Sequence, residues 1–141
     1  MKTKVLKKLL CIVIATVIAM TVTLVASAES ATPYDLTSAS KSSAISINSS
    51  GVITMTSCFF TAESNIVQVD IEHSLEKHAF LWTWNAFGGK SSKTVFGSNA
   101  VLDTYCTGLE SGTYRLKSVF TAYLDDGRSE TVTVYSNELT I

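Results

Sequence analysis

The sequence is poor in the residues that most catalytic and metal sites use. It has 2 histidines and 3 cysteines among 141 residues, and charged residues make up 16% of the chain. His73 and His78 are five residues apart, which places them on opposite faces if they share one strand, and no cluster has the spacing of zinc ligands. No G-x-S-x-G, H-E-x-x-H or phosphate-binding glycine loop occurs. We therefore predict no catalytic residue, no metal site and no cofactor.

Proline occurs once, at Pro33, and no segment beyond residue 28 has the 3.6-residue period of a helix. Short alternating segments instead follow one another with turn residues every 8 to 12 positions. This pattern predicts an all-β protein: a single Ig/fibronectin III-like β-sandwich of about seven antiparallel strands.

The strongest strand pattern lies between Ser111 and Ile141. Tyr114, Leu116, Phe120 and Ala122 lie at every second position, and a β-branched and aromatic segment follows from Thr131 to Tyr135. Asp125-Asp126-Gly127 lies between them and predicts a hairpin turn, although two adjacent carboxylates would also suit calcium or acid–base chemistry. Ser111-Gly112 before Tyr114 is typical of a tyrosine corner, in which the Tyr hydroxyl bonds to upstream backbone, and an ordinary half-buried strand Tyr is an equal alternative.

Residues 1–28 have the order of a secretory signal peptide. A basic head with four lysines precedes an apolar run from Leu9 to Val25 and the small residues Ala26-Ser27-Ala28. The run is at the lower length limit for a membrane anchor, but the cleavage-site pattern favours removal after Ala28. Cys11 precedes most of the run and does not resemble a lipoprotein site. We predict a secreted, extracellular protein.

Cleavage changes the charge balance. It takes away four of the 11 basic residues and none of the 12 acidic ones, which leaves a net charge of about −5. A mildly acidic chain without a basic patch is a poor ligand for nucleic acid or an anionic membrane surface. We therefore predict no nucleic-acid partner, and no membrane contact after the signal is removed.

The remaining chain is expected to have two parts. Residues 29–43 are rich in Ser, Thr and Ala and predict a flexible lead-in. Residues 44–141 are expected to form the sandwich domain, with an opening hairpin turned at residues 48–51 and a clear strand from Asn65 to Leu75. His73, near the end of that strand, is expected at the rim of the core. A turn around 76–78 and a short strand ended by Gly88-Gly89 are expected next.

In that short strand Phe80, Trp82 and Trp84 occupy every second position, so their side chains are expected on one face. An exposed aromatic stripe of this kind stacks on sugar rings or receives a peptide. The alternative, that the three aromatics fill the core, is favoured by the residues alone because Ig-like domains commonly bury a Trp.

The layout resembles a family of short secreted proteins of Gram-positive bacteria, of unknown function, that have an Ig-like sandwich. The resemblance rests on ISINSSGVITMTS, the alternating Val67–Ile71 strand, the Trp-bearing strand, and the GTYRLK and ETVTVYS segments. It implies secretion and a small extracytoplasmic β domain, and it supplies no catalytic residues.

Cys58 and Cys106 are the only cysteines that remain after cleavage. They fall in strands that are neighbours in this type of sandwich, and the compartment is oxidising, so we predict a cross-strand disulfide. The alternative is that both are small buried hydrophobic residues, and a register error of one residue would turn the two sulfurs to opposite faces.

These features favour a non-catalytic binding or surface-interaction module, whose partner would be a cell-wall or host glycan or a protein. The alternative is a diffusible secreted effector such as a toxin, an inhibitor or a bacteriocin-like protein. Exposure of the tryptophans distinguishes the two, because a buried pair leaves the binding module without a site.

Overall fold

The computed structural model describes residues 36–141, which belong to one compact unit. After a short 3-10 turn at Leu36–Ser38, the strands are β1 (Ser40–Ile47), β2 (Ile53–Phe60), β3 (Ile66–Phe80), β4 (Thr83–Phe96), β5 (Asn99–Cys106), β6 (Thr113–Leu124), β7 (Ser129–Tyr135) and β8 (Leu139–Thr140). One sheet has the order β1-β2-β5, and the other has the order β4-β3-β6-β7, with the short β8 also paired to β6. All these pairings are antiparallel.

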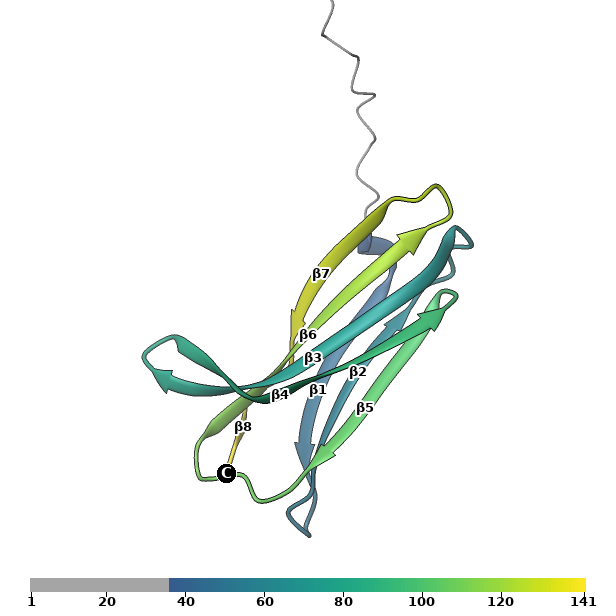
Figure 1. The fold of residues 1–141 in the computed structure, drawn as a ribbon. Helices are drawn as coiled ribbons and strands as arrows, with labels where there is room; N and C mark the ends of the chain where they lie inside the picture. Colours follow the sequence, from purple (N-terminus) through teal and green to yellow (C-terminus); the bar gives the residue numbers. More distant parts are fainter. Residues whose placement is uncertain (1–35) are drawn as a thin grey trace, which may run out of the picture. The chain divides into compact units, whose positions relative to one another are not determined.

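The two sheets pack face to face (Figure 1), which confirms the predicted all-β sandwich of about seven strands. The 3-10 turn is the only helical segment in residues 36–141, so no helix there could cross a membrane. The predicted signal peptide at 1–28, including Cys11, lies outside the described residues.

The alternation predicted for β6 is present along its whole length. Its inward side chains are buried at every second position: Tyr114, Leu116, Ser118, Phe120, Ala122 and Leu124. The strand pairs with β3 on one side and with β7 on the other. β6 therefore supplies the centre of the core, as its period of two indicated.

The core has two apolar clusters. The first surrounds Phe59 and Phe120, whose ring centroids are 6.0 Å apart, and the second surrounds Tyr114, Leu116 and Ile53. Three buried polar side chains, Ser57, His73 and Ser118, are also fully or almost fully enclosed between the sheets.

The turn after β6 forms as predicted. Gly127 has a φ of 85°, which favours glycine, and the Asp126 carboxylate accepts a hydrogen bond from the Arg128 backbone N–H at 3.0 Å. Within residues 36–141 no group of three or more His, Cys, Asp or Glu side chains could hold a metal ion. Asp126 is thus engaged in forming the turn.

The predicted tyrosine corner is also confirmed. Tyr114 is fully buried, and its hydroxyl donates to the carbonyl oxygen of Glu110 at 2.8 Å. Its ring meets Phe87 edge-on, with centroids 5.5 Å apart. The bond fixes the loop that enters β6 against the second core cluster.

Tyr114→Phe is expected to lower the free energy of unfolding by about 1 kcal/mol, the typical net value of one hydrogen bond. Glu110 is an exposed residue, so its carbonyl is expected to bond to water in the variant without the larger penalty of a buried unpaired acceptor. Urea denaturation measures the change. An unchanged midpoint would show that the hydroxyl bond contributes nothing to stability.

The predicted start of the domain at residue 44 is too late. β1 begins at Ser40, and Leu36 and Ala39 are buried in the first core cluster. The Ala39 backbone N–H donates to the Leu36 carbonyl in the 3-10 turn. Residues 36–43 are therefore part of the domain and not of a flexible lead-in, because two isolated apolar residues among serines are enough to anchor this segment.

The turn predicted around 76–78 is also wrong. β3 continues to Phe80, and the chain reverses at Leu81 and Trp82. β4 likewise does not end at Gly88-Gly89. Ser74 pairs with Lys90 and Leu75 pairs with Phe87, so the two glycines form a bulge inside the strand. Gly88 has a φ of 79°, which glycine adopts without steric cost.

Candidate functional site

Beyond the glycine bulge, β3 and β4 continue as a hairpin arm, defined here as residues 76–86. Glu76 and Lys77 at its base still pair with β6, and from His78 onward the arm has two strands. Figure 1 shows the arm extending away from the body of the sandwich. Bulges increase local twist and bend the strands that carry them. The bulge therefore separates the part of β4 that lies on the sandwich from the part that leaves it.

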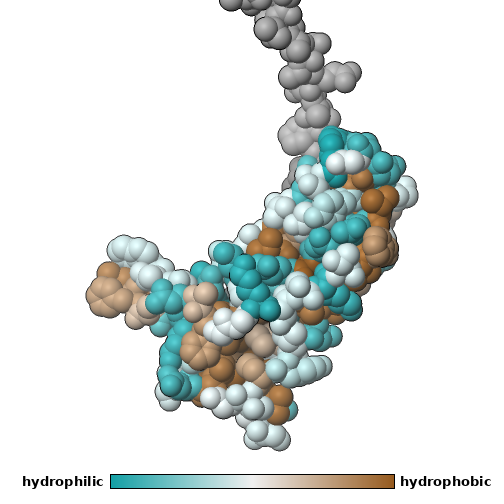
Figure 2. All heavy atoms as spheres, viewed as in Figure 1, coloured by the Kyte–Doolittle hydropathy of each residue, from teal (hydrophilic) through white to brown (hydrophobic). Residues whose placement is uncertain are grey.

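The end of the arm is apolar and exposed. Phe80, Leu81 and Trp82, called the tip below, are 72%, 60% and 83% exposed. Figure 2 shows apolar side chains at the free end of the arm. Soluble proteins seldom leave three adjacent large apolar side chains in water, and such patches mark contact sites. The tip is the strongest candidate site in the described part of the chain.

The turn at the tip is strained. Leu81 has a φ of 54°, and it is the only residue other than glycine with a positive φ in residues 36–141. A left-handed conformation costs an ordinary L-residue about 1–2 kcal/mol, and hairpin turns normally place Gly, Asn or Asp there. The Nε2 atom of His78 donates to the Leu81 carbonyl and holds the turn. The chain thus keeps a large apolar side chain where a glycine would be easier to accommodate.

The base of the arm is held by an arginine between two aromatic rings. The Arg115 guanidinium carbon lies 4.2 Å from the Trp84 ring centroid and 4.1 Å from that of Tyr135. The same guanidinium pairs with the Glu76 carboxylate at 2.7 Å. These contacts connect the arm to β6 and β7, because Glu76 lies on β3, Trp84 on β4 and Tyr135 on β7.

The three aromatics singled out from the sequence therefore have different environments. Phe80 and Trp82 are exposed, so the alternative in which they fill the core is wrong for both. Trp84 is half-buried, with Arg115 against its ring and the His78 ring edge-on at 5.0 Å. Trp84 thus supports the arm, while Phe80 and Trp82 are available to a partner.

His73 lies deeper than predicted, at 2% exposure instead of at the rim of the core. Its Nδ1 is 2.9 Å from the Ser57 hydroxyl and its Nε2 is 2.7 Å from the Thr104 hydroxyl. The chain of polar contacts continues from Ser57 to Ser118 at 2.6 Å and from Ser118 to Ser43 at 2.8 Å. Burial lowers the pKa of His73, and the negative charge of Asp103 opposes this only in part.

This polar row brings a serine and a histidine within hydrogen-bond distance, a pairing that the sequence analysis did not anticipate. Ser57 and Ser118 are completely buried, however, so a substrate would have to separate the sheets to reach either hydroxyl. A nucleophile must be accessible to the atom it attacks. In this conformation the row joins the two sheets and exposes no nucleophile.

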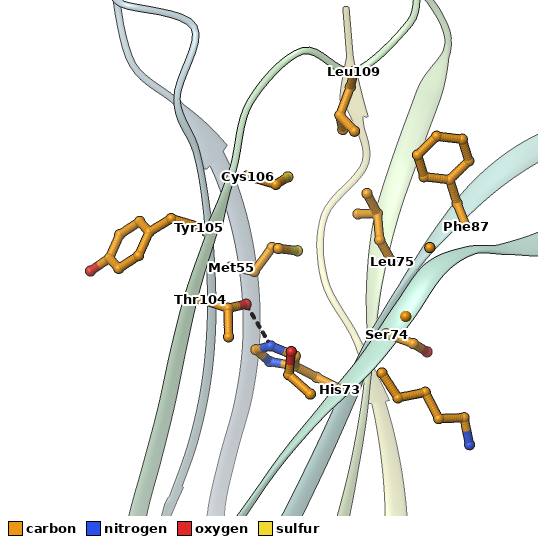
Figure 3. Close-up of a pocket in the computed structure, with 13 residues that line it drawn as sticks. Met55, His73, Ser74, Leu75, Phe87, Thr104, Tyr105, Cys106 and Leu109 are labelled. Atoms are coloured by element: carbon orange, nitrogen blue, oxygen red, sulfur yellow. Dashed lines mark hydrogen bonds between the residues drawn. The ribbon is translucent and has the colours of Figure 1, made fainter.

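A groove of about 290 Å³ opens between β5 and the inner part of β4. Figure 3 shows Met55, Leu75, Cys106 and Leu109 directed into it, with His73 bonded to Thr104 at its side. Burial raises the pKa of the Cys106 thiol, which keeps it protonated and a weak nucleophile near neutral pH. The groove thus combines apolar and polar side chains, and its one thiol is not activated.

The predicted disulfide is wrong, since Cys58 and Cys106 are both free. They do lie on neighbouring strands, β2 and β5, but Cys58 pairs with Val101, whereas Cys106 pairs with Ile53. Five residues of strand separate the two positions, about 17 Å at the usual rise. Ile53 and Cys106 also face the core while Cys58 faces outward, so neither distance nor direction permits a bond.

The two histidines are not brought together either. His73 lies in the core and His78 lies on the exposed arm, bonded to the turn at Leu81. Each ring thus has its own hydrogen-bond role, and neither belongs to a group of ligands that could hold a metal in the described residues.

No family model matches the chain, and no curated protein matches it. The resemblance drawn from the sequence therefore stays a prediction. Among solved structures, wild-type OgpA from Akkermansia muciniphila has 10% sequence identity and a TM-score of 0.37, over 69% of this chain and 27% of that chain. Catalytically inactive OgpA in complex with an O-glycopeptide substrate has 9% identity and a TM-score of 0.39, over 73% and 30% of the two chains. This chain thus spans less than a third of the length of OgpA, and the similarity is too low to support a conclusion.

Proposed function

We propose that this protein is a secreted, non-catalytic binding module whose contact site is the tip of the hairpin arm. The observation that carries the proposal is the exposure of three consecutive large apolar side chains, Phe80, Leu81 and Trp82, at the end of an arm that leaves the sandwich. Large aromatic and aliphatic side chains supply most of the binding energy at contact sites once they leave water.

Two further observations support a role in binding. Leu81 keeps a strained φ that a glycine would relieve, and strain of this kind concentrates at functional sites. The stack of Trp84, Arg115 and Tyr135 connects the arm to the sheet, so the tip is carried on a supported element.

Trp82→Ser is expected to weaken attachment of the protein to intact cells by roughly tenfold, because one large apolar side chain no longer leaves water on binding. The measurement uses fluorescently labelled residues 29–141 on bacterial and epithelial cells. Intact cells present glycans, proteins and lipids together, so the test does not depend on the class of partner.

Phe96→Ser is the matched control. Phe96 is 83% exposed at the other end of β4, and its replacement also removes one exposed aromatic ring. If the wild type attaches to none of these cells, or if both variants lose attachment equally, the tip is not the contact site.

A further inference from the structure

We infer that the partner of the tip is the interfacial region of a lipid bilayer, into which Phe80, Leu81 and Trp82 insert. The inference rests on the proposed function and specifies its partner. Three properties of the arm carry it: the distribution of charge, the hydrogen bond to the carbonyl at the turn, and the distance from the tip to the first charged side chain.

The tip lies within a long segment that has no acidic residue, lysine or arginine. Residues 78–89 contain no Asp, Glu, Lys or Arg. The acidic residues that give the chain its negative charge lie elsewhere, so net charge does not describe the arm. Net charge predicts weak binding to anionic surfaces, but it does not apply to an uncharged tip that meets uncharged lipid, so the predicted absence of membrane contact does not extend to the arm.

The turn is closed by contacts within the arm. Phe80 pairs with Thr83 across the two-residue turn and His78 pairs with Trp84, with Ala79 bulged between these two pairs. The Leu81 carbonyl accepts a hydrogen bond from the His78 side chain. In lipid, each backbone group without a hydrogen bond carries a large free-energy cost. The turn is suited to leave water because the Leu81 carbonyl is bonded to the His78 side chain.

The dimensions agree with shallow insertion. Lys77 is the first charged residue before the tip, three residues from Phe80, which is about 10 Å along a strand. Interfacial segments bury their apolar side roughly 5–10 Å into the boundary between headgroups and acyl chains. Insertion to that depth would leave Lys77 at the level of the headgroups, and Trp82 would lie where tryptophan is enriched in membrane proteins.

The shape of the site favours lipid over a sugar or a protein. A sugar site combines a stacking ring with polar groups that bond the hydroxyls, whereas positions 79–82 hold Ala, Phe, Leu and Trp. The tip also projects from the arm and is not hollowed (Figure 2), so a partner would have to receive it in an apolar phase or pocket. A bilayer offers that phase without requiring a matching pocket.

The test uses phosphatidylcholine vesicles and residues 29–141, which contain the whole compact unit and lack the apolar run at Leu9–Val25. In a Trp84→Phe protein, Trp82 is the only tryptophan. Its emission should shift to shorter wavelength on addition of vesicles, and lipids brominated on the acyl chain should quench it. Phe80→Ser should weaken vesicle binding roughly tenfold, since one buried aromatic ring is lost.

Phe96→Ser should bind vesicles as the wild type does, and circular dichroism establishes that each variant is folded. Absence of vesicle binding, an unshifted Trp82 emission, or equal losses in Phe80→Ser and Phe96→Ser would overturn the inference. If the protein does not bind vesicles but binds purified mucin or peptidoglycan in a way that depends on Trp82, the partner is a soluble or wall polymer. That result would leave the proposed function standing without the bilayer.

Discussion

Replacing Phe120 with alanine is expected to lower the free energy of unfolding by about 3–5 kcal/mol. Phe120 is completely buried at the centre of β6, and its ring packs against Phe59 from the opposite sheet. Removing the ring loses the free energy gained when its apolar surface leaves water. It also leaves a cavity, because the hydrogen-bonded strands of the two sheets cannot move together to fill the space. Since small domains are stable by only about 5–15 kcal/mol, the loss would be a large part of the total.

Phe96→Ala provides the comparison, because it makes the same chemical change at a site that is 83% exposed. Its effect should stay within about 0.5 kcal/mol. Because the chemical change is the same in both variants, the difference between their urea midpoints reports the effect of burial. Equal midpoints for Phe120→Ala and Phe96→Ala would mean that the sheets do not pack through β6 as described.

Acidification below pH 6.5 is expected to destabilise the protein through His73. The pKa of His73 is lowered from its ordinary value of 6.5, mainly because burial disfavours the charged ring, while Asp103 partly opposes this. Between the ordinary and the lowered value the unfolded chain binds a proton that the folded chain does not. Stability is therefore fully present above pH 6.5 and falls with decreasing pH, by at most about 1.4 kcal/mol per pH unit for one proton.

His73→Gln should remove this dependence of stability on pH, since glutamine can form hydrogen bonds to Ser57 and Thr104 without titrating. His78→Gln is the control, because it removes the other histidine of the domain and leaves His73 with its partners. Asp126, whose pKa is lowered by hydrogen bonds from Arg128, loses its contribution only near and below its ordinary value of 3.8. Urea midpoints between pH 5 and 7 therefore isolate His73, and a wild-type midpoint that is flat over this range would contradict the prediction.

Much of the fold could be predicted from the sequence because the period of two is a local signal. The buried positions of β6, the turn at Gly127 and the hydroxyl bond of Tyr114 all follow from short segments read alone. Pairing between distant segments is different. The sequence places Cys58 and Cys106 in neighbouring strands, as in the structure, but register depends on loop lengths and bulges that no single strand reveals.

The arm was missed for a related reason. Hairpin turns are recognised by Gly, Asn or Asp, and Leu81-Trp82 has none of them, so the sequence predicts the reversal earlier in the chain. Gly88-Gly89 looks like the end of a strand and is instead a bulge within one. Burial of His73 depended on Ser57 and Thr104, which lie in other strands and become its partners only in the folded protein.

The order of pairing along the chain also bears on how the protein reaches its folded state. The arm joins consecutive strands through a two-residue turn, whereas β3 meets β6 across most of the domain, with Ile66 opposite Leu124. Local hairpins form in microseconds, while distant strands must first overcome the entropy of closing a long loop. We expect the arm to form early and the sandwich to assemble later, so that the apolar tip is exposed to its surroundings before the core that supports the arm exists.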